Sequence, residues 1–176
     1  MNHKYKYLSK NFILFSISSI GPKIIAFIMV PLYTNYLSTS DYGRGDIVTT
    51  SASLMLPLVV MCVESAVLRF CFDENYNQDE VISSGLFICI RGIMLCIIGT
   101  AIMSRFTFFK LYPSYLTAFA LILFSDGMYN LMTNYARGTN NVQYMVEMSL
   151  ITTIASCILN VVLLVILRCG IGGYLL

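Results

Sequence analysis

Charged residues are scarce in this chain. They make up 11% of its 176 residues, whereas soluble globular domains carry about 25%. Hydrophobic residues account for 57%, which excludes an ordinary soluble domain and indicates a membrane protein. The formal net charge is only +2 and Lys and Arg form no cluster, so the sequence predicts no nucleic-acid partner.

Histidine is almost absent, and the cysteines lack metal-binding spacing. The single histidine, His3, lies in the N-terminal tail, which disfavours a membrane enzyme that relies on histidine chemistry. None of the six cysteines forms a C-x-x-C pair, and most lie within apolar runs. We interpret them as small packing residues rather than metal ligands or disulfide partners. The sequence therefore predicts no enzyme, no cofactor and no metal.

Long apolar stretches dominate the chain instead. A transmembrane helix needs about 20 apolar residues, and the chain has room for five such helices with short loops. We predict spans at Phe12–Tyr33, Ile47–Leu68, Ile82–Met103, Ser114–Tyr135 and Met148–Leu167. The expected fold is an all-α polytopic transmembrane helical bundle, with residues 1–176 in one domain. The first span lacks an A-x-A cleavage site and exceeds a signal-peptide core, so we expect it to stay uncleaved.

The N-terminal tail sets the expected orientation. Positive charge favours the cytoplasmic side of a membrane, and the first span is preceded by Lys4, Lys6 and Lys10. Pro22 and Pro57 fall within the first two spans. Each removes a backbone hydrogen bond, which favours a kink.

Tyrosines gather near the predicted span ends. An aromatic belt at the lipid headgroups is the ordinary explanation for this placement. The alternative is a sugar-stacking role for Tyr33, Tyr36 or Tyr42.

Three charged residues, Lys23, Arg91 and Asp126, fall near the middle of predicted spans. A charge at that depth costs about 2.5–3.5 kcal/mol on insertion scales. Such residues persist where they face a cavity or a partner rather than lipid. A membrane protein with a polar interior is therefore expected, and transport is the first hypothesis.

Helical spacing sorts the remaining polar and small residues into faces. The fourth span carries a polar stripe formed by Asp126, Asn130, Asn134 and Arg137. Shorter stripes lie on the fifth span (Thr152, Ser156, Asn160) and on the first (Ser16, Ser19, Lys23). The third span has a face of small residues suited to close helix packing, made of Gly85, Cys89, Gly92, Cys96 and Gly99. Polar faces on several helices could converge on one cavity.

Structural roles compete with functional ones at each of these positions. Lys23 could line a cavity, or form a buried ion pair with Asp126 or Glu64, and the same choice applies to Arg91. Asp126 could neutralise one of these cations, or Asp126 or Glu64 could couple a proton or cation to transport. Asparagines such as Asn130 within spans more often form interhelical hydrogen bonds than ligand contacts.

Four segments together resemble a known family. They are Pro31–Gly43 (PLYTNYLSTSDYG), Glu64–Phe70 (ESAVLRF), Tyr135–Gly138 (YARG) and Gly170–Tyr174 (GIGGY). In this order and spacing the chain resembles the polysaccharide repeat-unit flippases (Wzx-type). These export O-antigen and capsule units and belong to the multidrug/oligosaccharidyl-lipid/polysaccharide exporter superfamily.

The resemblance implies a bacterial inner-membrane protein that moves an undecaprenyl-diphosphate-linked oligosaccharide to the periplasmic leaflet. It also implies two helical lobes around a central cavity, alternating access and an ion gradient, with polysaccharide polymerase and glycosyltransferases as partners beside the membrane lipids. Arg and Lys pair with phosphate oxygens, so Lys23 and Arg91 are expected to line the cavity. Arg69 and Arg137 would lie nearer its cytoplasmic mouth, with Asn130 and Asn134 beside them.

The chain departs from this family in length. Family members have about twelve spans or more, and this sequence stops where a sixth span should begin. We therefore expect an N-terminal part, an incomplete lobe, that would not transport alone. The rival readings are a multidrug extruder of the same superfamily, whose cationic substrates suit Lys23 and Arg91 poorly, and a non-transporting membrane subunit whose buried charges only pair helices.

Overall fold

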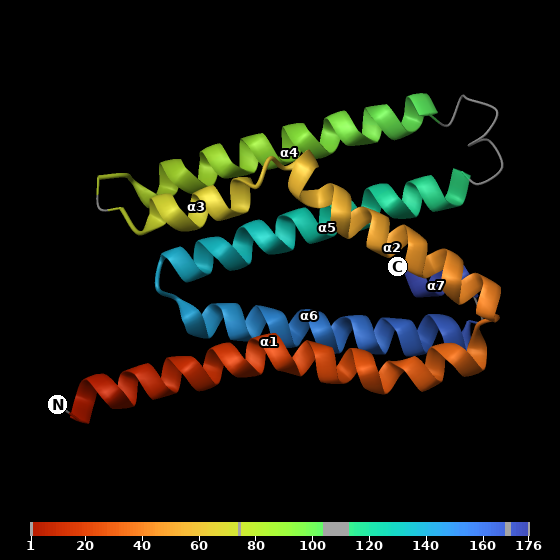
Figure 1. Ribbon diagram of the computed structural model, residues 1–176, viewed down its shortest axis with the longest axis horizontal. Coiled ribbons are helices and arrows are strands. Elements are labelled where there is room, and N and C mark those ends of the chain that lie inside the picture. Colours follow the sequence, from red (N-terminus) through yellow and green to blue (C-terminus); the bar gives the residue numbers. More distant parts are fainter. Residues whose placement is uncertain (1, 74, 104–112, 168–169, 176) are drawn as a thin grey trace. The chain divides into compact units, whose positions relative to one another are not determined.

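The structure is a computed structural model that describes residues 2–73, 75–103, 113–167 and 170–175 (Figure 1). Within these residues every regular element is a helix and no strand is present. Long apolar sequences adopt helices in a membrane because a helix satisfies its own backbone hydrogen bonds. The predicted all-α fold class is thereby confirmed.

The helices follow one another with short connections. They are α1 (Asn2–Tyr36), α2 (Thr39–Val59), α3 (Val63–Cys71), α4 (Gln78–Met103), α5 (Pro113–Gly138), α6 (Val142–Val161), the π-helical η1 (Val162–Ile166) and α7 (Ile171–Leu175). In the described residues, α1, α4, α5 and the α6–η1 segment are long and apolar enough to cross a membrane, and α2 with α3 would make a fifth, bent span. The chain is a multi-pass membrane protein.

Contacts divide the chain into two compact units, which are described separately. Unit 1 comprises Met1–Tyr42 and Asn140–Tyr174, and unit 2 comprises Gly43–Thr139 and Leu175–Leu176. The single transmembrane domain predicted from the sequence stays a prediction.

Unit 1 is built on the packing of α1 against α6. Near the middle of α6 the Ser149 hydroxyl donates a hydrogen bond to the Ser18 carbonyl oxygen, at 3.0 Å. Farther along, Cys157 Sγ lies 3.5 Å from Met29 Sδ. Both contacts advance in the same chain direction, so the two helices are parallel. Helix α1 runs through Gly21-Pro22-Lys23 as one element, and the kink predicted at Pro22 stays a prediction.

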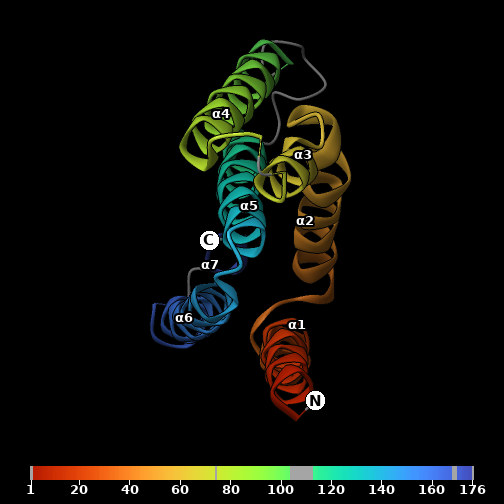
Figure 2. The same cartoon turned by 90° about the vertical axis from the view of Figure 1, so that its left-hand side faces the viewer.

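Unit 2 is a tight cluster of α3, α4 and α5 joined by the end of α2 (Figure 2). Its core consists of Ala52, Leu56, Val60, Val63, Val67, Cys71, Cys89, Ile93, Leu123 and Leu131. Glycines allow the helices to approach closely: a Cβ added at Gly85 would lie 2.5 Å from Val67 Cγ2, and one at Gly138 would lie 2.5 Å from Cys71 Cβ.

The small face predicted on the third span is confirmed over its first half. Cys89 is buried, and a Cβ added at Gly92 would lie 2.1 Å from the Val59 carbonyl oxygen. By contrast, a Cβ at Gly99 would meet nothing within 4 Å. Among the described cysteines, Cys62, Cys71, Cys89, Cys96 and Cys157 are free thiols, and Cys169 lies outside the described residues.

The second predicted span differs from the structure, because it is two helices rather than one. α2 and α3 are bent by 55° relative to each other, and Met61 and Cys62 between them each have a φ of 54°. The Cys62 N–H donates to the carbonyl oxygen of Pro57, five residues earlier, at 3.0 Å. The break lies beyond Pro57 rather than at it. The contact of the Val59 carbonyl with Gly92 therefore accounts for its position better than the proline does.

We expect Gly138→Ala to destabilise the protein by about 1–3 kcal/mol, because the new methyl group would overlap Cys71 in a packed contact. Thermal unfolding in detergent measures this effect. Gly99→Ala is the matched control, since a methyl group there meets open space and alanine favours the helix by up to about 1 kcal/mol. Equal stabilities for the two variants would contradict the close packing of α5 on α3.

Candidate functional site

The two basic residues predicted at mid-span depth are both exposed. Lys23 lies on α1 and Arg91 on α4. Arg91 projects away from the buried side of α4 that carries Cys89 and Ile93, as the spacing predicts. No acidic partner of either residue occurs among the described residues of its own unit. Each charge therefore needs a water-filled cavity or a further partner in the membrane.

Lys23 shares one flank of the α1–α6 pair with two hydroxyl residues. The contacts Ser18–Ser149 and Met29–Cys157 fix the register, which sets Lys23 near the level of Thr152. Successive helix residues turn by about 100°, and counting from these contacts places Lys23, Thr152 and Ser156 on the same side of the parallel pair. Unit 1 thus presents a basic and hydroxylated flank at mid-span depth.

The hydroxyl and amide groups of α6 are hydrogen-bonded within the helix. Ser156 Oγ donates to the Thr152 carbonyl oxygen at 2.5 Å, and Thr152 Oγ1 donates to that of Met148. Asn160 Nδ2 donates to the Ser156 carbonyl oxygen at 3.0 Å. The hydroxyl donors of Thr152 and Ser156 are therefore used within α6, whereas the Asn160 Oδ1 atom is buried without a hydrogen-bond partner.

The polar stripe of α5 lies in unit 2 and is half-buried. It consists of Asp126, Asn130, Asn134 and Arg137. Asn134 Nδ2 donates to the Asn130 carbonyl oxygen at 3.0 Å, so this amide group is bonded within its own helix. Asp126 lies beside Gly127, whose position is packed against Ile93 and Cys89 of α4. The stripe therefore borders the helix contact rather than forming its centre.

Glu64 occupies the first turn of α3, directly after the break in the second span. Its Oε2 atom is buried and has no hydrogen-bond partner, a property that only Asn160 Oδ1 shares among side-chain atoms in the described part of the chain. Arg69 lies exposed near the end of the same helix.

The predicted site residues are thus distributed over both units. Lys23 belongs to unit 1, whereas Glu64, Arg69, Arg91 and the α5 stripe belong to unit 2. The ion pair of Lys23 with Asp126 or Glu64 stays a prediction. No group of three or more metal-binding side chains occurs in the described ranges.

A cluster of three tyrosines in unit 1 brings together segments that are far apart in the sequence. The Tyr33 and Tyr42 ring centroids are 6.3 Å apart, and Tyr174 of α7 lies 5.0 Å from Tyr33 and 5.6 Å from Tyr42. The Tyr33–Tyr174 pair is edge-to-face, a favourable aromatic geometry. The sequence placed Tyr33 and Tyr42 in an aromatic belt and did not predict their contact with Tyr174. The Gly170–Tyr174 segment (GIGGY), one of the segments that carry the family resemblance, was the sequence feature that could have drawn attention to Tyr174.

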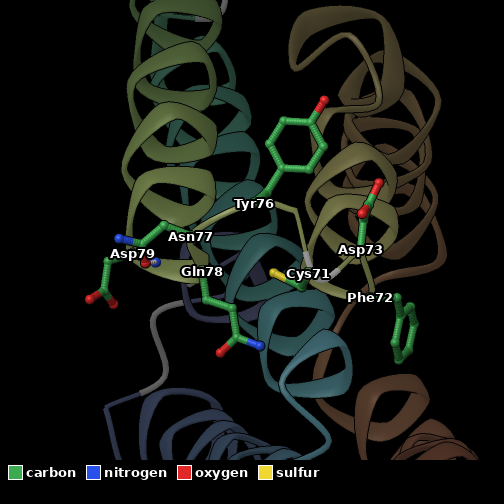
Figure 3. Close-up of a pocket in the computed structure, with 7 residues that line it drawn as sticks. All are labelled: Cys71, Phe72, Asp73, Tyr76, Asn77, Gln78 and Asp79. Carbon is green, nitrogen blue, oxygen red and sulfur yellow. Dashed lines mark hydrogen bonds between the residues drawn. The ribbon is translucent and has the colours of Figure 1, made fainter.

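A pocket of about 450 Å³ lies in the connection between α3 and α4 (Figure 3). Its lining consists of Cys71, Phe72, Asp73, Tyr76, Asn77, Gln78 and Asp79. In Figure 3 the Cys71 and Gln78 side chains turn towards the space between the helices, and those of Phe72 and Asp79 turn away. The lining includes two carboxylates and no Lys or Arg. This pocket therefore does not suit an anionic diphosphate.

These features define an all-α, multi-pass membrane protein with charged residues inside its spans. Comparison with protein-family models, with curated proteins and with solved structures finds no match.

We expect Tyr33→Ala to lower the free energy of unfolding by about 2 kcal/mol, because two ring contacts are lost. Tyr33→Phe keeps the ring and should change stability by less than about 1 kcal/mol. Thermal unfolding in detergent measures both variants, with the exposed Tyr144→Ala as control. If Tyr33→Ala matched Tyr144→Ala, the aromatic cluster would contribute nothing to the fold.

Proposed function

We propose that this chain acts in a flippase for lipid-linked polysaccharide repeat units. The observation that carries this proposal is the exposure of Lys23 and Arg91 at mid-span depth without an acidic partner in their own units. Insertion of such a charge is unfavourable by about 2.5–3.5 kcal/mol. An anionic ligand that binds these side chains within the membrane offsets this cost, and a diphosphate has the required charge.

The segments that carry the family resemblance contact one another in pairs, which supports the proposal. Tyr33 and Tyr42 of the Pro31–Gly43 segment pack against Tyr174 of the Gly170–Tyr174 segment. In unit 2, a Cβ added at Gly138 would lie 3.3 Å from the carbonyl oxygen of Leu68, so the Tyr135–Gly138 segment packs against Glu64–Phe70. Because these segments are distant in sequence but pack together, a substitution in one of them affects the packing of the other.

Each predicted site residue has a role in this proposal that follows from its charge. Lys23 and Arg91 bind diphosphate oxygens, since cationic groups form strong charge-assisted hydrogen bonds with phosphate. Arg69 and Arg137 attract the ligand at the cytoplasmic mouth, and Asn130 and Asn134 contact sugar hydroxyls. Glu64 or Asp126 couples transport to a proton or cation, because carboxylates inside a membrane mark ion pathways.

The proposed setting is the bacterial inner membrane, with the N-terminus in the cytoplasm because Lys4, Lys6 and Lys10 precede α1. The lipid-linked oligosaccharide is the substrate. Polysaccharide polymerase and glycosyltransferases are the proposed protein partners, because the unit is assembled on one side of the membrane and polymerised on the other.

We expect Lys23→Ala and Arg91→Ala, introduced into the gene, each to reduce surface polysaccharide by about tenfold or more, since a hydrogen bond to a charged group contributes about 1.5–3 kcal/mol. Surface polysaccharide is measured together with membrane protein level in a strain that lacks its own flippase. Lys23→Arg should retain most activity, and Arg44→Ala is the control for loss of a basic residue outside the proposed cavity. Unchanged polysaccharide at unchanged protein level would refute the cationic cavity.

A double substitution separates this proposal from a non-transporting subunit with paired charges. In that alternative, Lys23→Ala and Asp126→Ala each destabilise the protein, and the double variant restores its stability. In the flippase, Lys23→Ala impairs export while the protein level is maintained. Rescue of stability in the double variant would therefore count against a ligand-binding role for Lys23.

A further inference from the structure

The connection between α2 and α3 holds two consecutive residues in the left-handed backbone region. Met61 and Cys62 each have a φ of 54°, a conformation that is unfavourable for residues with a Cβ. Neither is a glycine, although glycine would adopt this conformation without strain. Strained residues persist when the surrounding packing determines their conformation, and they occur often at switch regions.

Helix α3, on one side of this connection, is firmly fixed. Val67 packs into the space above Gly85 of α4, and Cys71 packs into the space above Gly138 of α5, where an added Cβ would lie 2.5 Å away in each case. Val63, Val67 and Cys71 are all buried. The three helices therefore act as one body within unit 2.

Helix α2, on the other side, joins this body through its last two turns. Ala52 and Leu56 are buried in the core, and Gly45 earlier on the same face of α2 is also buried. On the opposite face, Ile47, Leu54 and Leu58 are 68%, 72% and 73% exposed. The closest contact is the Val59 carbonyl oxygen against Gly92, where an added Cβ would lie only 2.1 Å away. Because Gly92 has no side chain, the end of α2 can pack directly against α4 in the bent arrangement.

We propose that Val60–Cys62 is a hinge about which α2 swings relative to the α3–α4–α5 body. In the bent state the Val59–Gly92 contact is made and Met61 and Cys62 are strained. In the straight state both residues adopt the helical conformation and their backbone groups regain regular helical hydrogen bonds. The contact between the Val59 carbonyl and Gly92 is then lost. Two states that exchange strain for a packing contact lie close in free energy, which is the requirement for a hinge.

This hinge goes beyond the proposed function and does not depend on the identity of any substrate. Its test uses spin labels attached to cysteines that replace Thr50 of α2 and Ser83 of α4, in the protein with its native cysteines replaced by alanine. Electron–electron double resonance then gives the distribution of distances between the labels in lipid nanodiscs.

Met61→Gly and Gly92→Ala should shift this distribution in opposite directions. Glycine at position 61 relieves the strain and enriches the bent state about fivefold or more; the native side chain is 80% exposed, so little packing is lost. A methyl group at Gly92 meets the Val59 carbonyl and depletes the bent state. Gly99→Ala and Leu54→Gly are the controls for the added methyl group and for a glycine in α2.

A distance distribution that neither Met61→Gly nor Gly92→Ala alters would overturn the hinge. Opposite shifts with unchanged controls would support it, whether or not the protein exports polysaccharide. Met61→Gly carries the test alone if Gly92→Ala fails to fold, because an exposed position tolerates the change.

Discussion

Close approach of helix backbones at small residues is the interaction on which unit 2 depends. Lipid tails are as apolar as leucine side chains, so helices in a membrane associate through close packing rather than through the hydrophobic effect. Gly85, Gly92 and Gly138 supply that packing, each at a point where a Cβ would overlap a neighbouring atom. The contacts at Gly85 and Gly138 hold α3 against α4 and α5, which also pack against each other, and that arrangement in turn determines where Glu64 and Arg69 lie.

The cost of charge inside a membrane is the second constraint, and it links the fold to function. Most of the apolar surface of α1 and α4 is exposed, as expected for helices that face lipid or further helices. Lys23 and Arg91 interrupt that surface. A helix that needed only to pack would gain stability from an apolar residue at these positions. In the proposed flippase, an anionic substrate would offset the cost of these two charges.

Sequence reasoning predicted the features that depend on local spacing. The five apolar stretches became helices because span length and backbone hydrogen bonding require it. The small face of α4 followed from its three- and four-residue spacing. The sequence predicted a kink at Pro57 in the second span but not the break at Met61 and Cys62, because neither residue favours a positive φ and the contact with Gly92 is tertiary. The meeting of Tyr174 with Tyr33 was missed for the same reason, since pairing across the chain leaves no periodic signal.

Unit 1 joins two segments that are far apart in the sequence, and this has a consequence for the assembly of the protein during synthesis. Its α1 and α6 contacts join residues as far apart as Ser18 and Ser149, which are separated by 131 positions. At a synthesis rate of about 5–20 residues per second, this separation corresponds to roughly 7–26 s between the two segments. During that interval α1 resides in the membrane without its partner, with Lys23 among lipids or held by the insertion machinery. Helix α1 is therefore synthesised well before the helix against which it packs.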